Sequence, residues 1–453
     1  MPPKFGTSGL RGLVVELTHE LVSDHVLAFA DSCPIGSGVF VGHDLRDSSP
    51  DISKAVIAAL TGQGIAVTDC GAVATPALAL AAMEAGAAAV MITGSHIPAD
   101  RNGLKFYTPE GEITKAHEAQ ILSVLGQNRS APNSTGSRSK HDANPAFVDR
   151  YVAAFGANAL SGLTVGVYSH STVGRDMLQT VLTKLGANVK ELGRSSSFIP
   201  VDTEAVDPDT RQQLRDWAAQ GDFDAIVSMD GDGDRPLLTN AAGEVIPGDI
   251  LGQITSAFLA AEAVVTPVSS NTGVDRGPFK TVERTKIGSP FVISGMEQVG
   301  GAVVGYEANG GFLLGFNAMG PAGPIAQLMT RDSVLPIVAT LTAARAEGID
   351  SRVALEPARV TAADRLQEVP TDKSKALVAA LSADPEPFLS KISGDVAKRD
   401  TTDGLRLTLT DGRIVHLRPS GNAPELRLYV EADNQALAQS TLELGLSAFR
   451  ELI

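Results

Sequence analysis

The chain has 453 residues, 43% of them hydrophobic and 20% charged, and a formal net charge of −15. This composition is typical of a globular protein with room for about three domains of ~150 residues, and the negative charge argues against nucleic acid or a membrane surface as the main partner. Two cysteines in so long a chain, without zinc-ligand spacing, favour a reducing compartment. We expect a cytoplasmic protein, because the N-terminus lacks a signal-peptide pattern and the most apolar stretch, residues 72–92, contains polar residues and a proline.

One pattern of predicted elements occurs three times along the chain. Residues 38–71 read as a β-branched strand, a polar turn, an amphipathic helix, a glycine break and a second strand. Residues 163–193 share this layout, and residues 263–296 follow it more loosely. Because a strand–helix–strand unit makes its two strands parallel, the sequence predicts three related α/β domains with mixed, largely parallel sheets.

After each unit comes a further apolar strand that ends in a loop of unusual composition. The three stretches are residues 86–96, ending in "TGSH", residues 222–235, ending in "DGDGDR", and residues 300–311, ending in "YEANGG". Open α/β sheets bind ligands at the carboxyl ends of their strands. We therefore expect the three loops to converge on one central cleft.

Two other regions complete the predicted organisation. The polar stretch from Gln127 to Pro145 reads as a linker or mobile loop between the first two units. Residues 403–432 alternate apolar and polar residues around a Thr410-Asp411-Gly412 turn, which predicts antiparallel hairpins. A closing helix, roughly Asn434 to Glu451, completes a smaller C-terminal α+β domain.

The "DGDGDR" loop has the composition of a metal site. Asp230, Asp232 and Asp234 lie at alternate positions directly after a predicted strand, and three converging carboxylates repel one another unless a cation lies among them. Oxygen ligands suit Mg²⁺ above all, with Ca²⁺ and Mn²⁺ as alternatives. An EF-hand is excluded, because Arg235 and Ala241 occupy its glycine and glutamate positions. The simpler alternative is a solvated acidic turn.

Near the C-terminus, the segment "RPSGNAPELR" has the composition of an anion site. Backbone amides of such a turn and guanidinium groups bind phosphate well, and the alternative is a hairpin turn with ordinary surface arginines. The candidate residues are Arg418, Ser420, Gly421, Asn422 and Arg427. Glu307 and Asn309 of the third loop are suited to sugar hydroxyls, although a glycine-rich loop explains that segment equally well.

Ser95 and His96 follow the first of the three strands. A classical serine hydrolase is disfavoured, because the segment lacks the G-x-S-x-G elbow and sequence neighbours rarely point at each other in an extended turn. A serine close to a metal-binding triad has another use, which is to accept and donate a phosphoryl group.

Taken together, these motifs resemble those of the α-D-phosphohexomutases, the phosphoglucomutase/phosphomannomutase family, over the whole chain. The resembling segments are "FGTSGLRG" (Phe5 to Gly12), "TGSHIP" around Ser95, Asn102-Gly103-Leu104-Lys105, Asp230 to Arg235, Glu307 to Gly310 and Arg418 to Pro424. The resemblance implies three related α/β domains and a C-terminal domain around a central cleft. We expect the boundaries to be 1–145, with the phosphoserine loop; 146–250, with the metal loop; 251–365, with the sugar loop; and 366–453, with the phosphate loop.

The chain departs from the usual family pattern at a few positions. Gly94 and Ile97 replace the usual alanine and asparagine beside the serine, and Asn422 replaces a threonine of the phosphate loop. In the sugar loop, Asn309 replaces a serine, and Gly311 lies where a histidine is frequent. These changes remove no nucleophile, metal ligand or phosphate-binding arginine, but they leave the identity of the sugar open.

The resemblance also implies a role for each candidate residue. Ser95 is the phosphorylated serine, and Mg²⁺ bridges it to Asp230, Asp232 and Asp234. Arg11 and Lys105 are the favoured groups for proton transfer, with His96 a weaker candidate. The implied substrate-binding residues are Thr7, Ser8, Arg235, Lys286, Glu307, Asn309, Arg418, Ser420, Gly421, Asn422 and Arg427.

The implied reaction interconverts hexose 1-phosphate and hexose 6-phosphate, of glucose or mannose, through a hexose 1,6-bisphosphate that also serves as activator. The expected partner is a small sugar phosphate, and the chain is expected to be a monomer or homodimer. The alternatives are a metal-dependent sugar phosphatase, a phosphoglucosamine mutase and a non-catalytic sugar-phosphate sensor. The sensor is disfavoured because the serine and all three aspartates are present.

Overall fold

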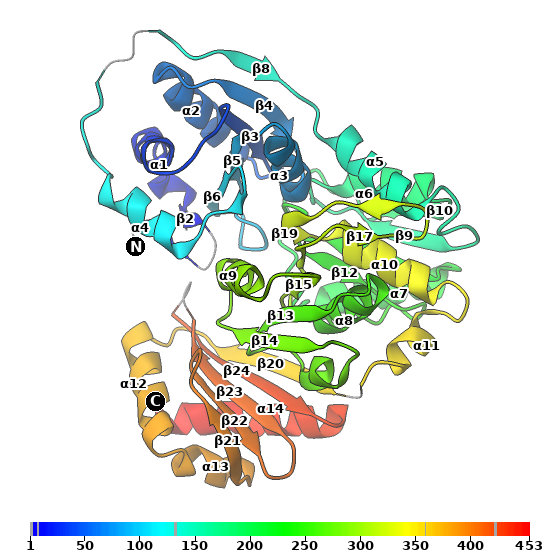
Figure 1. Cartoon of the computed structure of the whole chain (residues 1–453). Helices are drawn as coiled ribbons and strands as arrows, with labels where there is room; N and C mark the ends of the chain where they lie inside the picture. The colour runs from blue at the N-terminus through cyan, green and yellow to red at the C-terminus, as the bar shows by residue number, and fades with distance from the viewer. Residues whose placement is uncertain (1–2, 7–8, 131–133, 358, 421–423) are drawn as a thin grey trace.

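The computed structural model describes residues 3–6, 9–130, 134–357, 359–420 and 424–453. Three α/β units and a C-terminal α+β unit follow one another along the chain, from the blue unit at the top of Figure 1 to the orange and red unit at the bottom. The predicted fold class is therefore confirmed.

The first unit is built on an eight-stranded mixed sheet with the order β1-β2-β6-β5-β3-β4-β8, with β7 paired to β6. Its strands are β1 (Lys4–Phe5), β2 (Leu10–Leu13), β3 (Val39–His43), β4 (Val67–Ala72), β5 (Ala88–Ile92), β6 (Arg101–Thr108), β7 (Gly111–Glu112) and β8 (Arg138–Lys140). Its helices are η1 (Val14–Glu16), α1 (His19–Ser32), α2 (Ser49–Gly62), α3 (Thr75–Glu84) and α4 (Lys115–Ser123).

The second unit has a four-stranded sheet and the third a five-stranded one. The second contains α5 (Asn144–Phe155), β9 (Thr164–Tyr168), α6 (Arg175–Lys184), β10 (Asn188–Leu192), α7 (Pro208–Gln220), β11 (Ala225–Met229) and β12 (Pro236–Leu238). The third contains α8 (Gly248–Phe258), β13 (Ala263–Pro267), η2 (Thr272–Arg276), β14 (Thr281–Thr285), α9 (Ser289–Val299), β15 (Val303–Tyr306), β16 (Phe312–Leu314), the small pair β17 (Ala318–Met319) and β18 (Pro324–Ile325), β19 (Leu328–Asp332), α10 (Val334–Ala344) and α11 (Ile349–Ala354).

The three units share one strand order, which confirms the predicted repeat. The corresponding orders are β4-β3-β5-β6, β10-β9-β11-β12 and β14-β13-β15-β16, with the last strand antiparallel in each case. The three loops of unusual composition connect equivalent strands, β5 to β6, β11 to β12 and β15 to β16. Each loop thus begins where the last parallel strand of its unit ends, as ligand loops of open α/β sheets do.

Two details differ from the sequence prediction. In the third unit a short 3-10 turn, η2, takes the place of a helix between β13 and β14. The following Gly277-Pro278 pair explains this, because proline lacks the N–H that a longer helix would need. Part of the predicted linker is also structured: β8 pairs in parallel with β4, and α5 begins at Asn144.

The first three units pack around one continuous apolar core. Buried residues of this core include Leu78 of α3, Tyr151 of α5, Leu178 of α6 and Val338 of α10. Burial of apolar surface is the main stabilising term in folding. A shared core therefore fixes the three loops relative to one another.

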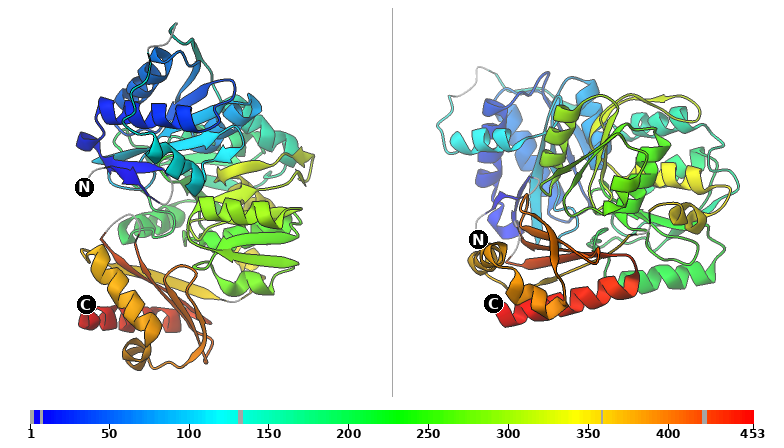
Figure 2. Two further views of the ribbon diagram at one scale, coloured as in Figure 1. Left: turned by 60° about the vertical axis from the view of Figure 1, so that its left-hand side comes forward. Right: turned by 60° about the horizontal axis from the view of Figure 1, so that its bottom comes forward.

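The C-terminal unit has its own core and lies against one side of this block (Figure 2). Its antiparallel sheet has the order β20-β24-β23-β22-β21. The elements are β20 (Val360–Leu366), α12 (Thr371–Ala383), α13 (Glu386–Ile392), β21 (Val396–Asp400), β22 (Leu405–Leu409), β23 (Ile414–Pro419), β24 (Leu426–Ala432) and α14 (Gln435–Leu452). The predicted hairpins and closing helix are confirmed. Within the described part of the chain, no helix is long and apolar enough to cross a membrane.

Candidate active site

Ser95 lies in a tight, fully buried turn after β5. Among the described residues it is one of four non-glycine residues with a positive φ, here 56°. Its backbone N–H donates to Thr93 Oγ1 at 2.7 Å, and the Thr93 hydroxyl donates to Asp44 Oδ2 at 2.7 Å. A left-handed conformation is costly for serine unless its surroundings hold it, and these contacts supply part of that support.

Arg46 supplies the rest of the support for the serine loop. Its buried guanidinium donates to the backbone carbonyls of Ser95 at 2.9 Å and Ile97 at 2.6 Å, and to two more carbonyls farther along the loop. It also pairs with Asp44 and lies 3.9 Å from the ring centroid of Phe198 in the second unit. Arg46 thus fixes the loop by hydrogen bonds that a shorter or uncharged side chain could not make together.

The unusual Gly94 is explained by the position of this arginine. A Cβ atom on Gly94 would lie 2.7 Å from Arg46 Cζ and 2.8 Å from its Nε. The alanine usual in the resembled family would therefore push the guanidinium away from the carbonyls that it holds.

We expect Gly94→Ala to lower kcat by about tenfold or more and to destabilise the fold by ~1–3 kcal/mol, the usual cost of overpacking a filled site. Thermal unfolding and steady-state kinetics measure both effects. Gly62→Ala, in α2, is the matched control, because nothing lies within 4 Å of the added Cβ. Unchanged kcat and stability in Gly94→Ala would contradict this account of Arg46.

The three aspartates of the β11–β12 loop are fully buried beside Ser95. One carboxylate oxygen from each lies within 4.8 Å of those of the other two. Ser95 Oγ donates to Asp230 Oδ2 at 2.5 Å. The Oδ1 atoms of Asp232 and Asp234 have no hydrogen-bond partner. Converging buried oxygens without partners fit a hard cation such as Mg²⁺.

Other units hold this loop from two sides. From the first unit, Thr75 Oγ1 at the start of α3 donates to Asp232 Oδ2 at 2.6 Å. From the third unit, Ser333 Oγ donates to the carbonyl of Gly233 at 2.7 Å. The geometry of the triad therefore depends on all three α/β units.

Burial and neighbouring charges shift the pKa values of Asp230 and Asp234 in opposite directions. Burial, together with the charges of Asp232 and Asp234, raises the pKa of Asp230 to about 8. Burial acts in the same direction on Asp234, but Arg331 and Lys105 outweigh it and hold the pKa of Asp234 below its usual value. Lys105 Nζ donates to Oδ2 of Asp232 at 2.6 Å and of Asp234 at 2.5 Å.

His96 and Arg235 form a pair at the same place. Arg235 Nη1 lies 2.9 Å from His96 Nδ1, and Ser95 Oγ lies 3.4 Å from the same nitrogen. Burial lowers the pKa of His96 well below its usual value, and the charges of Arg235 and Arg427 act in the same direction. The lowered pKa favours the neutral form of His96, and since arginine can only donate, Nδ1 is its acceptor nitrogen.

Arg11, on β2, completes the cluster of positive charge. Burial, reinforced by the charges of Arg235 and Arg331, lowers the pKa of Arg11 to about 10. Several buried cations that repel one another favour the binding of a highly charged anion among them.

The sugar loop forms a compact turn between β15 and β16. The Asn309 side chain accepts from the Gly311 N–H at 2.9 Å, and its Nδ2 lies 3.5 Å from Glu307 Oε2. The Asn309 carbonyl accepts from Thr203 Oγ1 of the second unit at 2.9 Å. Glu307 and Asn309 are both about 5% exposed. Their turn is thus tied to the unit that carries the metal loop.

In the C-terminal unit, Arg418 and Ser420 lie at the end of β23 and Arg427 on β24. Arg418 Nε lies 3.0 Å from Asp403 Oδ2, and Arg427 pairs with Glu425. The predicted residues Gly421 and Asn422, together with Thr7 and Ser8, lie outside the described residues. Lys286 is exposed, and the N–H of Ile287 beside it donates to the same Asp403 at 2.9 Å.

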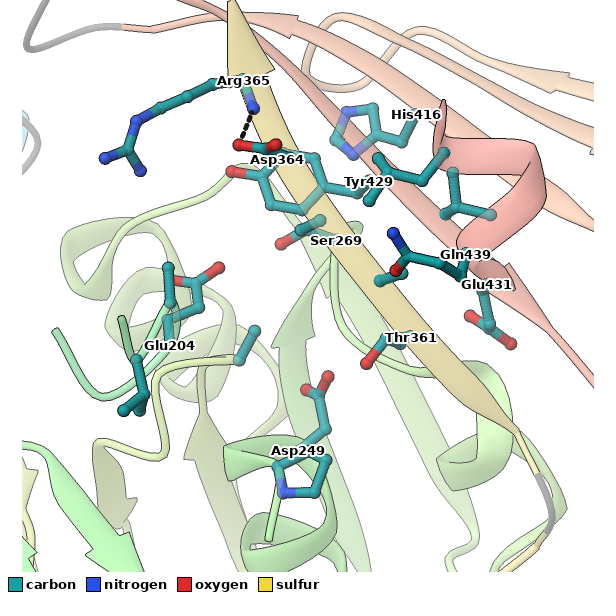
Figure 3. A pocket seen from close by; sticks show the side chains of 18 of the residues that line it. Glu204, Asp249, Ser269, Thr361, Asp364, Arg365, His416, Tyr429, Glu431 and Gln439 are labelled. Atoms are coloured by element: carbon teal, nitrogen blue, oxygen red, sulfur yellow. Dashed lines mark hydrogen bonds between the residues drawn. The ribbon is translucent and has the colours of Figure 1, made fainter. Parts of the chain in front are cut away.

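A cavity of about 980 Å³ lies between the C-terminal unit and the second and third units. In Figure 3, Glu204, Ser269 and Asp249 face β20, while Tyr429 and His416 lie on the C-terminal sheet. Ser95 and the three aspartates do not line this cavity, which instead reaches the sugar loop at Ala308. It leaves the C-terminal unit only partly packed against its neighbours.

Several residues that build the site escaped sequence analysis. Arg46, Thr75 and Arg331 each contact a predicted site residue across a unit boundary or a long stretch of chain, and Ser333 contacts Gly233 between two predicted metal ligands. Only the "HDLRDSS" segment around Arg46, a polar turn directly after a strand, carried a signal of the kind used for the other loops.

Comparison with known proteins agrees with the motifs. The four models of "Phosphoglucomutase/phosphomannomutase" domains match in order, with α/β/α domains I, II and III at residues 2–132, 145–243 and 247–357 and the C-terminal domain at residues 352–443. A phosphomannomutase of Sinorhizobium fredii is 45% identical over 99% of this chain and 98% of its own, and one of Salmonella muenchen is 42% identical over 98% and 95%. A crystal structure of a phosphoglucomutase/phosphomannomutase family protein from Burkholderia thailandensis has a TM-score of 0.78 at 21% identity, covering 98% of this chain and 97% of its own.

Proposed function

Because the chain belongs to the phosphoglucomutase/phosphomannomutase family and is a phosphohexomutase, we propose that mannose phosphates are its preferred substrates and that Ser95 carries the transferred phosphoryl group. The 2.5 Å contact of Ser95 Oγ with Asp230, beside two further aspartates, is the observation that carries the second part. Identity of 42–45% to two phosphomannomutases supports the first.

In the proposed mechanism the resting enzyme carries a phosphoryl group on Ser95 Oγ. The 6-hydroxyl oxygen of hexose 1-phosphate attacks the phosphorus, the bond between phosphorus and Ser95 Oγ breaks, and the hydroxyl proton passes through a protein group to the departing Ser95 Oγ. The hexose 1,6-bisphosphate turns end for end, and Ser95 Oγ attacks the phosphorus of the 1-phosphate. The bond from that phosphorus to the C1 oxygen breaks, and the Ser95 proton passes through the same protein group to the C1 oxygen. Hexose 6-phosphate then leaves. Added bisphosphate activates the enzyme because it loads Ser95.

Asp230, Asp232 and Asp234 would hold a Mg²⁺ ion together with an oxygen on Ser95. When bound, this ion neutralises charge on the phosphoryl oxygens and acts as a Lewis acid. Lys105, paired with Asp232 and Asp234, limits repulsion among the carboxylates and keeps their oxygens in place. Arg235 and Arg11 add the positive charge that a bisphosphate needs.

We assign proton transfer to Arg11 and Lys105 in preference to His96. The acceptor nitrogen of His96 already takes an N–H of Arg235, and its pKa is lowered by burial and by Arg235. The pKa of Arg11, lowered by burial to about 10, makes its neutral form more accessible than that of an ordinary guanidinium.

The remaining loops bind the rest of the substrate. Arg418, Ser420 and Arg427 bind the phosphate that is not being transferred, with Lys286 beside them. Glu307 and Asn309 accept and donate hydrogen bonds to ring hydroxyls, which exchange places when the bisphosphate turns. Because the 1-phosphate and the 6-phosphate of the sugar take turns at Ser95, both loops must accept either orientation of the sugar.

A mutase assay with matched substrates tests the proposal. With Mg²⁺ and a trace of hexose 1,6-bisphosphate, we expect mannose 1-phosphate to give mannose 6-phosphate at a kcat/KM above that for glucose 1-phosphate and well above that for glucosamine 1-phosphate. Free phosphate, recorded in parallel, should stay below the amount of product. A higher kcat/KM for glucose or glucosamine would refute the mannose preference, and release of phosphate without 6-phosphate would indicate a hydrolase.

A further inference from the structure

β19 carries a buried arginine at the point where the three α/β units meet. Arg331 is 2% exposed, and its Nη2 lies 2.8 Å from Asp234 Oδ2 in the metal loop, an ion pair without hydrogen-bond alignment. Its Nη1 lies 3.5 Å from Glu307 Oε2 in the sugar loop. Its Nε lies 3.8 Å from Glu112 Oε1 in the first unit. One cation therefore faces carboxylates from all three units.

A glycine makes room for this guanidinium. A Cβ atom on Gly311 would lie 2.8 Å from Arg331 Cδ and 3.0 Å from its Cγ. Gly311 belongs to the sugar loop, so that loop packs directly against the arginine stem. The position of Arg331 and the composition of the sugar loop thus depend on each other.

The arginine also lies in a segment that holds the metal loop. Two residues farther along, Ser333 Oγ donates to the carbonyl of Gly233 between the metal-loop aspartates. Glu112 is itself held by Ser289 Oγ at 2.6 Å, which fixes the third carboxylate that Arg331 faces. A movement of β19 would therefore shift contacts in both loops.

Because a single charge is shared, the two loops are linked energetically. A buried guanidinium that pairs with two carboxylates pairs more fully with one when the other loses its charge. Stronger pairing with Asp234 neutralises more of the charge that attracts a cation. Energetic coupling of this kind acts equally in both directions.

We propose that Arg331 is a positioning residue that couples the sugar loop to the metal loop, so that the charge on Glu307 changes the affinity of the aspartate triad for Mg²⁺. The inference rests on the proposed function in one respect, the assignment of the metal to the triad. It adds that sugar recognition and metal binding are linked through one side chain.

A double-mutant cycle tests this coupling without turnover. Mg²⁺ affinity is measured by calorimetry in the Ser95→Ala background, where no phosphoryl group varies between preparations, for the four combinations of Arg331 or Arg331→Met with Glu307 or Glu307→Gln. We expect Glu307→Gln to weaken Mg²⁺ binding about threefold to tenfold when Arg331 is present and less than about twofold when it is absent. If Glu307→Gln weakens Mg²⁺ binding by the same factor with Arg331 and with Arg331→Met, the proposal is overturned.

Two further variants keep the test valid if Arg331→Met does not fold, since that change removes the cation that three buried carboxylates share. Arg331→Lys keeps the charge but cannot reach all three acids at once, and Gly311→Ala displaces the guanidinium without removing it. Each should reduce the effect of Glu307→Gln on Mg²⁺ affinity by at least about half, and an undiminished effect in both overturns the coupling.

Arg352→Met is the matched control in the third unit. Its guanidinium pairs only with Glu356, at 2.8 Å, among the ion pairs of the described residues, so the effect of Glu307→Gln should be unchanged. Turnover of mannose 1-phosphate by the Ser95 chain is measured separately. A chain that converts no hexose phosphate contradicts the proposed function. If Glu307→Gln changes Mg²⁺ affinity by the same factor with and without Arg331, only the role of Arg331 is overturned.

Discussion

Ser95→Ala is expected to abolish the interconversion of hexose 1-phosphate and hexose 6-phosphate, with kcat at least ~1,000-fold below that of the unmodified chain. Alanine offers no oxygen to carry the phosphoryl group, and the mechanism has no other step by which the group can move from one sugar oxygen to the other. The assay follows both phosphates and free phosphate in the presence of Mg²⁺ and bisphosphate.

The fold should survive this change, because the turn is held by the Arg46 guanidinium and by the backbone N–H of residue 95. Mass spectrometry after incubation with hexose 1,6-bisphosphate should find one added phosphoryl group in the unmodified chain and none in Ser95→Ala. Mutase activity that persists in a folded Ser95→Ala protein would rule out the phosphoserine mechanism.

The second large effect is expected from Asp232→Asn, which should lower kcat by ~100-fold or more at ordinary Mg²⁺ concentrations. Oδ2 of Asp232 already accepts from Lys105 and Thr75. In the variant the amide oxygen takes over these bonds, and its NH₂ group then points to the oxygen position that would bind metal. The loss should therefore be one of metal affinity.

Rates measured against Mg²⁺ concentration, after removal of metal with a chelator, separate affinity from folding. The unmodified chain should lose activity with the chelator and regain it with Mg²⁺, whereas the variant should need a much higher concentration. Asp222→Asn, an exposed carboxylate just before β11, serves as control and should behave like the unmodified chain. An unchanged Mg²⁺ requirement in Asp232→Asn would remove this residue from the metal site.

The repeated units and the loops that carry Ser95, the aspartates and Glu307 were predictable because their signals are local. A strand, a glycine break and a polar loop follow each other within a short stretch of sequence, and the rule that loops at the carboxyl ends of parallel strands meet brings the three loops together. The C-terminal hairpins were predictable for the same reason, from alternation around the Thr410-Asp411-Gly412 turn.

What could not be predicted depends on contacts between distant segments. Arg46 holds carbonyls about fifty positions away, and Arg331 faces acids in three units. Neither residue lies in a periodic pattern or beside a glycine that would single it out. The short strand β8 was missed because three polar residues carry no alternation, and its place is set by the free edge of β4.

The C-terminal unit has a core separate from that of the other three units, and this has a consequence for the size of substrate that fits. Ser95, the aspartates and Glu307 belong to units that share one core, whereas Arg418 and Arg427 belong to a unit with a core of its own. In the proposed mechanism, a rigid-body shift of that unit would alter the distance from Ser95 to the arginines proposed to bind the second phosphate, and would leave the distance from Ser95 to the sugar loop unchanged. The length of bisphosphate that fits the proposed site would then depend on a single interface.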